Sequence, residues 1–280
     1  SGFKRKGGLE QTDTDFFGGD QSNYTIIFED DAVSVSDHRI GGLGIIELEN
    51  VELIDFESEI AAFVGPFDIE TYGGLAQLDQ HDAEAIVELY IAYFNRAPDA
   101  IGLNFWASAF SNGTSLDQMA SLFAGQSETQ ATYPEGTSNT DFANSVYANV
   151  LGRAPDQVGL TFWVDALNEG TVTRDKFILQ ILEGARSPLK IAEGHDFILQ
   201  QLADREYLEN KIDIGAQFAV HRGMSDIANA NTVMQLFDGT PDSILDAVNA
   251  IDTFYQEARS PYDGEFLLQV VGVMNEPFAI

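Results

Sequence analysis

The sequence predicts an α+β protein: a small N-terminal antiparallel β meander, then a duplicated all-α helical domain, then a C-terminal extended strand. Three observations carry this prediction. Apolar residues alternate with polar ones between residues 13 and 60, a long segment recurs after 57 residues, and an apolar run lies near the C-terminus. Alternation with a period of two is typical of half-buried strands, whereas a repeat this long is typical of stacked helical units.

The β domain is expected over residues 13–64, behind an N-terminal arm of residues 1–12. Its apolar residues take alternate positions on both sides of an acidic turn: Tyr24, Ile26, Phe28, Val33 and Val35. A glycine-rich break at residues 41–44 separates them from two further short apolar segments. Short alternating segments bounded by such breaks predict a meander of short strands. Residues 61–80, which contain two pairs of breaker residues, are expected to form a linker.

The helical domain is expected over residues 80–258, and it contains one motif twice. The two copies span about residues 82–130 and 139–187, and their motifs run from Tyr90 to Trp106 and from Tyr147 to Trp163. Arg-Ala-Pro-Asp, Gly-Leu and Phe-Trp recur in register in the two motifs. A repeated unit of this size buries its apolar face against its neighbour, so the two copies should pack together.

Each motif residue has an expected local role. The proline ends the preceding helix, and the aspartate after it caps the next helix by accepting hydrogen bonds from free backbone N–H groups. The glycine permits close helix contact, the tryptophan lies on the same face, and the arginine pairs with a carboxylate or a helix-end carbonyl. Direct ligand contact by the arginines or tryptophans is the alternative. The residues concerned are Arg96, Asp99, Gly102, Trp106, Arg153, Asp156, Gly159 and Trp163.

Further helices are expected where a capping signal precedes an apolar stripe. Ser115 and Gln118 form a capping box, and Thr240-Pro241 supplies an N-cap with proline at the first helical position. The last segment, residues 259–280, is expected to be an extended tail. Its apolar run, residues 266–273, would be an aggregation hazard if it were exposed. It should therefore pair with the N-terminal sheet or with a sheet of a neighbouring subunit.

The charge balance limits the partners. Fourteen basic residues against 45 acidic ones give a formal net charge of −31, which repels nucleic acid and anionic membranes and attracts cations. No apolar run is long enough to span a bilayer, and the chain has no cysteine, which excludes disulfides and thiolate metal sites. The abundant carboxylates are the oxygen ligands that calcium, a hard cation, prefers.

Three segments of the β domain carry a resemblance: residues 17–26, from Phe-Gly-Gly-Asp to Tyr-Thr-Ile; residues 33–37, Val-Ser-Val-Ser-Asp; and residues 51–56, Val-Glu-Leu-Ile-Asp-Phe. Together they resemble the strand unit that follows calcium-binding glycine-rich repeats in secreted RTX-type bacterial proteins. The repeats themselves, Gly-Gly-x-Gly-x-Asp, are absent. If Ca²⁺ is the cofactor, the ligands are expected from Asp13, Asp15, Asp20 and Asp37.

The helical domain carries a second resemblance. The two Arg-Ala-Pro-Asp motifs, with their glycine and tryptophan, and the segment Tyr207–Val220 resemble a bacterial family of domains of unknown function built on Arg-x-Pro-Asp-x-x-Gly-x-x-x-Trp. That family recurs in secreted RTX, S-layer-like and adhesin-type proteins, and its motif is similar to one in phycobilisome linkers. The resemblance covers roughly residues 80–258 and implies surface-exposed, non-catalytic scaffolding.

No constellation of catalytic residues accompanies these motifs: the sequence has no His-Glu-x-x-His zinc helix, nucleophile elbow, phosphate loop or dinucleotide fingerprint. We therefore expect a non-catalytic binding or adhesion module outside the cell or on its surface, recognising cell-surface or matrix polysaccharide. The alternative is a structural subunit of a surface layer or of a phage-like particle, as a spike or fibre. A homo-oligomer or larger assembly is expected. A carbohydrate-active enzyme, the third hypothesis, would need a pocket of carboxylates with shifted pKa values.

Overall fold

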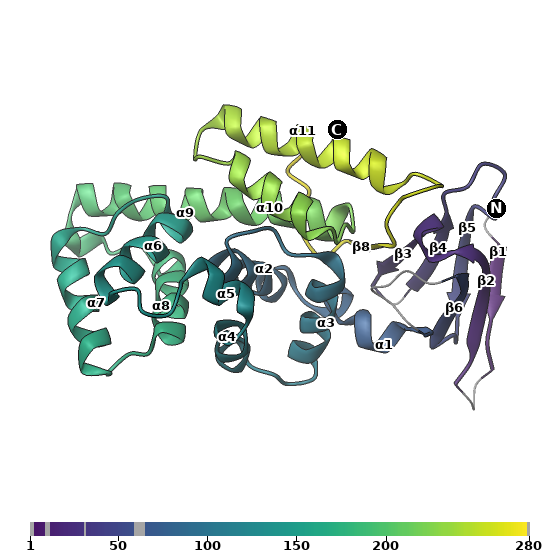
Figure 1. Cartoon of the computed structure of the whole chain (residues 1–280), viewed down its shortest axis with the longest axis horizontal. Coiled ribbons are helices and arrows are strands. Elements are labelled where there is room, and N and C mark those ends of the chain that lie inside the picture. Colours follow the sequence, from purple (N-terminus) through teal and green to yellow (C-terminus); the bar gives the residue numbers. More distant parts are fainter. Residues whose placement is uncertain (1–2, 9–11, 31, 59–64, 279–280) are drawn as a thin grey trace.

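The molecule is elongated, with β-strands at one end and the second repeat copy at the other (Figure 1). The computed structural model describes residues 3–8, 12–30, 32–58 and 65–278. The first repeat copy lies between the two ends, and the last two helices run along it (Figure 1). The fold is α+β, as the sequence predicts.

Two mixed sheets build the β end of the molecule. The larger sheet has the order β1 (Phe3–Lys6), β5 (Ile45–Glu49), β4 (Ala32–Asp37), β3 (Tyr24–Glu29), β8 (Leu267–Val271), and the smaller one the order β2 (Thr14–Asp20), β6 (Leu53–Ser58), β7 (Phe67–Asp68). A short 3₁₀ turn, η1 (Gln21–Asn23), joins β2 to β3. Buried aromatic rings pack between the strands, among them Phe17, Tyr24, Phe56, Phe67 and Phe266, with neighbouring centroids 5.3–5.5 Å apart.

The predicted antiparallel meander is wrong in its topology. Strand β4 does pair antiparallel with β3 and β5, but the pairs β1–β5, β2–β6 and β3–β8 are parallel. The chain passes to the other sheet after β1 and again after β5, so consecutive strands separate and distant ones meet. Parallel neighbours need such crossovers, and alternation of apolar residues does not encode them.

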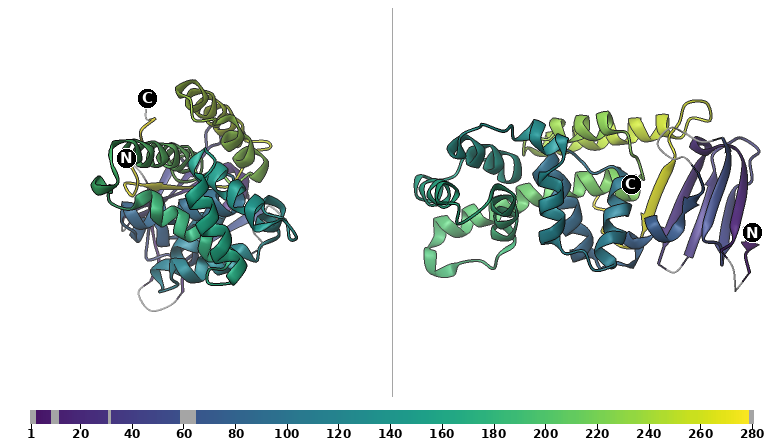
Figure 2. Two further views of the ribbon diagram at one scale, coloured as in Figure 1. Left: turned by 90° about the vertical axis from the view of Figure 1, so that its left-hand side faces the viewer. Right: turned by 60° about the horizontal axis from the view of Figure 1, so that its bottom comes forward.

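The C-terminal apolar run pairs with the N-terminal sheet, one of its two expected partners. Strand β8 lies parallel to β3, with Thr25 opposite Leu267, and Leu267 and Leu268 are fully buried. The backbone N–H of Leu268 also donates to the carbonyl of Gly223, at 3.0 Å, in the helical part. The end of the chain therefore ties the helices to the sheet (Figure 2).

The segment expected as an N-terminal arm contributes strand β1 to the larger sheet. Its three basic side chains form ion pairs within the chain: Lys4 with Glu47 at 2.8 Å, Arg5 with Asp15 at 2.6 Å and Lys6 with Glu49 at 2.6 Å. These cations are therefore already partly neutralised by carboxylates of the β end.

The prediction that residues 61–80 form a linker is wrong for residues 67–77. Residues 61–64 lie outside the described part of the chain. Strand β7, helix α1 (Ile69–Tyr72) and the 3₁₀ turn η2 (Gly74–Gln77) follow one another there, and Leu75 is fully buried. Gly74 serves a close approach rather than a break, because a Cβ on it would lie 2.3 Å from the Cα of Ser108.

The helices follow the repeat. The first copy contains α2 (Gln80–Phe94), α3 (Ala100–Ser111), α4 (Leu116–Ala124) and α5 (Ser127–Thr132), and the second α6 (Asn139–Leu151), α7 (Gln157–Glu169) and α8 (Arg174–Arg186). After the short turn η3 (Ile191–Glu193) come α9 (His195–Ala216), which continues into a π-helical turn, η4 (Gln217–His221), then α10 (Ile227–Leu236) and α11 (Pro241–Ala258). No helix among the described residues has the length and apolar character needed to cross a membrane.

The predicted capping signals are confirmed. Asp99 caps α3 and Asp156 caps α7, Ser115 and Gln118 form a reciprocal capping box, and Thr240 caps α11 with proline at its first turn. These interactions need only residues within one turn of each other, and this is why the sequence predicts them.

A buried lysine joins the two copies to the closing helix α9. The Nζ of Lys211 donates to the carbonyl and side-chain oxygens of Asn149, at 2.8 and 2.7 Å. The side-chain amide of Asn149 in turn donates to the carbonyl of Ile91 at 2.9 Å. Burial lowers the pKa of Lys211 to about 7. The amide oxygens replace the water that this group would otherwise bind.

Candidate functional site

The first motif copy is a closed, fully paired corner. The side chain of Arg96 is 3% exposed; its Nε donates to Glu128 at 2.5 Å, and its Nη1 donates to the carbonyl of Ala97 at 2.8 Å. Its Nη2 lies 3.2 Å from the carboxylate of Asp99, the N-cap of α3. Trp106 packs on Phe123, with ring centroids 5.2 Å apart. The pairing predicted for the arginine is confirmed, with both a carboxylate and a carbonyl.

The second copy repeats the corner with a different partner. Arg153 forms two hydrogen bonds with Asp204 of α9, both at 2.6 Å, and one with the carbonyl of Ala154 at 3.1 Å. The Nε1 of Trp163 donates to the hydroxyl of Tyr147 at 3.1 Å. The bond to Asp204 raises the pKa of Arg153, so its guanidinium is charged and already engaged.

The two motif glycines differ in the space that their surroundings leave for a side chain. A Cβ on Gly102 would lie 2.4 Å from the buried hydroxyl of Tyr90, whereas a Cβ on Gly159 would meet nothing nearer than its own cap, Asp156, at 3.4 Å. The hydroxyl of Tyr147, the counterpart of Tyr90, is instead turned to Trp163. The predicted close contact is therefore found at Gly102 only.

This difference gives a prediction for a pair of substitutions. Gly102→Ala should lower the free energy of unfolding by about 2 kcal/mol, because the methyl group overpacks the corner. Gly159→Ala should raise it by about 0.5 kcal/mol through the helix propensity of alanine and the reduced freedom of the unfolded chain. Urea unfolding of both variants beside the parent protein checks this. Equal effects at the two positions would contradict the asymmetry.

A cavity of about 210 Å³ opens beside the second motif. Its apolar wall is formed by Trp163, Tyr147, Leu151, Ile181 and Phe197, and polar side chains share its lining: Arg153, Asp156, Gln180, Lys190, Gln201 and Asp204. The side chains of Gln180 and Lys190 are exposed and make no hydrogen bond with other described residues. Rings on one side and free polar groups on the other make this a candidate binding site.

Comparison of the copies identifies two smaller side chains at the cavity. Phe94 in the first copy corresponds to Leu151 in the second. Counted from the N-caps Ser115 and Thr173, Phe123 of α4 corresponds to Ile181 of α8. Phe94 and Phe123 stack with their centroids 4.8 Å apart and fill the first copy. Their smaller counterparts both line the cavity.

A larger cavity of about 550 Å³ lies between the copies, and Glu88, a carboxyl group with a raised pKa, is part of its lining. Glu88 of α2 is 3% exposed, and its carboxylate accepts a hydrogen bond from the Nε of Arg186 at 2.5 Å. Burial raises the pKa of Glu88 to about 8; Arg186 opposes the rise, and Glu84 and Glu209 add to it. Since the group is buried and paired, we interpret it as a structural pair at the junction of the copies.

The shift predicts how stability depends on pH. A carboxyl whose pKa is higher in the folded state stabilises the fold fully below its unfolded pKa, and this contribution is lost as pH rises through the folded value. For Glu88 the window runs from 4.5 to about 8. Relative to Glu88→Gln, the parent protein should therefore lose stability as pH rises through this window.

Thermal unfolding of Glu88→Gln and the parent protein between pH 4.5 and 8 measures this difference. Asp213→Asn is the matched control, because burial raises the pKa of Asp213 only to about 6. The stability difference between this variant and the parent protein should therefore stop changing above about pH 6. If the ion pair with Arg186 dominated instead, Glu88→Gln would become the less stable protein as pH rises.

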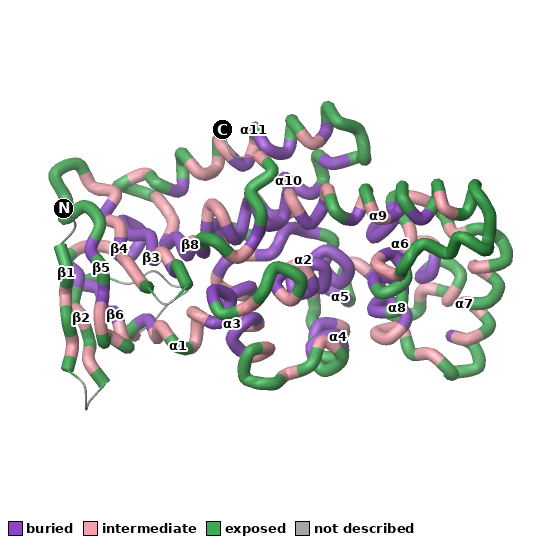
Figure 3. The backbone as a smooth tube through the Cα atoms, turned by 180° about the vertical axis from the view of Figure 1, so that it is seen from behind, coloured by how far each residue is buried: buried purple, intermediate pink, exposed green. Residues whose placement is uncertain are grey.

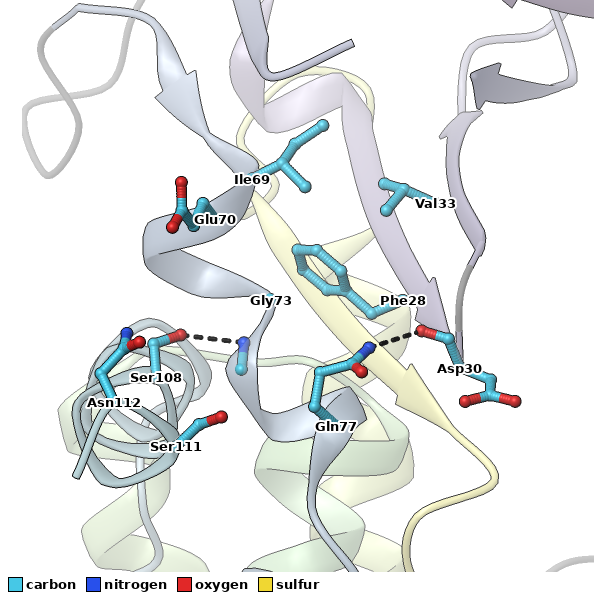
Figure 4. Close-up of a pocket in the computed structure, with 11 residues that line it drawn as sticks. Phe28, Asp30, Val33, Ile69, Glu70, Gly73, Gln77, Ser108, Ser111 and Asn112 are labelled. Carbon is cyan, nitrogen blue, oxygen red and sulfur yellow. Dashed lines mark hydrogen bonds between the residues drawn. The ribbon is translucent and has the colours of Figure 1, made fainter. Parts of the chain in front are cut away.

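A third cavity, of about 340 Å³, lies where the β end meets the helices (Figure 4). Ser108 of α3 and Asn112, the C-cap of that helix, face Phe28 and Val33 of the sheet across η2 (Figure 4). The Ser108 hydroxyl accepts a hydrogen bond from the N–H of Gly74 at 2.8 Å, and the Gln77 amide donates to the carbonyl of Asp30 at 2.9 Å. These bonds hold the joint between the two parts together, and Phe28, the aromatic ring of its lining, is almost fully buried.

The four aspartates expected to bind calcium do not converge on one site. Asp13 accepts from the N–H of Gly8, Asp15 pairs with Arg5, Asp20 accepts from Ser22 and Ser58, and Asp37 pairs with Arg39. Within the described ranges, no three His, Cys, Asp or Glu side chains are grouped so that they could hold a metal ion. These four aspartates therefore do not form a calcium site. Calcium binding stays a prediction for which the structure identifies no ligand set among the described residues.

Comparison with known protein families agrees with the repeat and its motif. The model of a family described as a domain of unknown function, DUF4214, matches residues 75–130 and again residues 120–186. The chain contains two DUF4214 domains. Their matches overlap at α4 and α5, whereas the sequence repeat places the second copy from about residue 139. No curated protein and no solved structure matches the chain.

The residues that line the cavity in the second DUF4214 copy were not predicted from the sequence as site residues, apart from the motif residues. Leu151 and Ile181 look like ordinary core residues, and Gln180 looks like solvated surface. A signal was available, because Phe94 aligns with Leu151 in the repeat. The second signal is hidden by one extra residue before α8, which shifts Phe123 away from Ile181 in a fixed 57-residue alignment.

Proposed function

We propose that this protein is a non-catalytic binding module, displayed outside the cell or on its surface, and that the cavity of its second DUF4214 copy recognises polysaccharide. One observation carries the proposal: two copies share one motif, and the stacked rings of Phe94 and Phe123 in the first copy have smaller counterparts in the second, Leu151 and Ile181, which line a cavity. A duplicated scaffold in which one copy opens is a means of gaining a site without losing the fold.

The lining suits sugars. An aromatic wall can cover the apolar C–H face of a pyranose ring, and amide, carboxylate and ammonium groups can bond to its hydroxyls. Asp156 uses one carboxylate oxygen to cap α7, at 2.8 Å from the N–H of Gly159. Gln180 and Lys190 have free bonding capacity. Because the net charge is −31, neutral polysaccharides are favoured over acidic ones.

The experiment that tests the function is a titration with soluble oligosaccharides from neutral, amino and acidic polysaccharides, followed by tryptophan fluorescence. The chain has two tryptophans, and Trp106 is packed in the closed copy, so a saturable change should come from Trp163. Gln180→Ala should weaken binding, because it removes an exposed amide and leaves the fold unchanged. A flat response to every class would contradict the proposal.

A structural subunit of a larger assembly is the second candidate function. It is favoured by apolar side chains exposed at the α7 end, where Val158 is 81% and Phe162 62% exposed. Apolar groups gathered at one end of a molecule mark interaction surfaces. Sizing of the protein over a range of concentrations tests this function independently of sugar binding.

A further inference from the structure

The first motif corner is covered by a short segment of this chain that belongs to no helix or strand. We define the first corner as residues 96–101 and its cover as residues 223–226, Gly-Met-Ser-Asp. The N–H of Ala100 donates to the carbonyl of Met224 at 2.9 Å, and the N–H of Ile101 donates to the hydroxyl of Ser225 at 3.2 Å. Met224 itself is fully buried. The cover thus satisfies two free N–H groups of the first turn of α3.

Neighbouring elements hold this cover in place. The carboxylate of Glu265 accepts from the backbone N–H of Ser225 at 2.8 Å and of Asp226 at 3.1 Å. The carbonyl of Ala230 in α10 accepts from the N–H of Ala97 at 3.3 Å. Ala97 and Ala100 are 0% exposed as a result.

The second corner, residues 153–158, has the same motif and no cover among the described residues. Val158, the counterpart of Ile101, is 81% exposed. The backbone N–H groups of Gln157 and Val158 donate to no other described residue, unlike those of Ala100 and Ile101. Helices α10 and α11 lie over the first copy and end short of α7, which forms the far end of the molecule (Figure 1). The tube of α7 is correspondingly exposed or half-buried over most of its length (Figure 3).

We propose that the second corner binds an extended peptide segment of a partner protein, in the way that residues 223–226 cover the first corner. The segment presents a carbonyl oxygen to the N–H of Gln157, a serine or threonine hydroxyl to the N–H of Val158, and an apolar side chain to the corner. A neutral or basic flank suits it, because this chain carries a net charge of −31.

A second copy of this chain is the less suitable occupant. Its own segment 223–226 is held in its own first corner by Glu265 and α10. Two molecules of this charge also repel each other. Two residues distinguish the corners: Val158 replaces Ile101, which keeps an apolar side chain, and Gln157 replaces Ala100. The side-chain amide of Gln157 lies back along α7, 3.3 Å from the hydroxyl of Thr161. Replacing Gln157 by alanine makes the second corner resemble the first.

The test uses the whole protein and a synthetic peptide of residues 220–229, Val-His-Arg-Gly-Met-Ser-Asp-Ile-Ala-Asn, observed through backbone amide resonances. The amides of Gln157 and Val158 should shift saturably. Val158→Asp should weaken binding at least tenfold and Gln157→Ala should strengthen it several-fold. Leu245→Asp, at an exposed leucine of α11, is the matched control and should leave binding unchanged. A peptide with aspartate in place of methionine should fail to bind.

Three results would overturn the proposal. The first is the absence of a saturable shift at Gln157 and Val158, or a shift that survives Val158→Asp. The second is a shift confined to Ala100 and Ile101, which would mean that the peptide exchanges with the internal cover. The third is a dimer abolished by Val158→Asp, which would assign this surface to a second copy of the chain. Because Val158 is exposed, circular dichroism should show Val158→Asp to be folded.

Discussion

The double variant Leu151→Phe/Ile181→Phe is expected to lose polysaccharide binding and to unfold at higher temperature than the parent protein. The two phenylalanines are the residues that fill the first copy at the corresponding positions, so the second copy already has the backbone to receive them. Filling the apolar side of the cavity contributes about 1 kcal/mol to the free energy of unfolding. Once the cavity is filled, a sugar can no longer reach its aromatic wall.

Binding is measured by the fluorescence titration and stability by thermal and urea unfolding on the same samples. Leu245→Phe, a change of equal chemistry at an exposed position of α11, is the control and should alter neither quantity. A double variant that is folded, more stable and still binds sugar would place the binding site elsewhere. A double variant that is less stable would mean that the second copy cannot repack around two larger rings.

The sequence predicts those features of the structure that depend on residues close together in the chain, and it fails for those that depend on distant residues. The caps at Asp99, Asp156, Ser115 and Thr240 involve residues within one turn, and all four are confirmed. The sheet topology depends on pairs such as Thr14 with Leu53, far apart in the chain, and apolar alternation is the same for parallel and antiparallel partners.

The candidate site shows the same limit. Repetition of the motif identified Trp163 and Arg153, but not whether they lie in a core or beside a cavity. That outcome depends on which residue of α8 takes the place of Phe123, and a single extra residue before the helix changes it. The partner of Arg153 likewise comes from α9 through Asp204, while Arg96 finds Glu128 within its own copy. Neither carboxylate is marked by the motif.

These different partners lead to the second large effect: Arg96→Met should lower the free energy of unfolding by about 3 kcal/mol, and Arg153→Met by about half as much. Arg96 is almost fully buried, and its loss leaves Glu128 and the cap Asp99 without their cation. Removing one member of a buried pair costs about 3–5 kcal/mol. The lower end applies here because the side chain of Glu128 is 33% exposed.

Arg153 is 27% exposed, and after its removal the carboxylate of Asp204 still accepts a hydrogen bond from Gln200 at 2.8 Å, so less is left unpaired. Urea unfolding of the two variants measures the difference, with Arg259→Met as a control at an arginine for which no ion pair is formed among the described residues. A larger loss from Arg153→Met would mean that α9, rather than the motif corner of the first copy, carries most of the stability of the helical part.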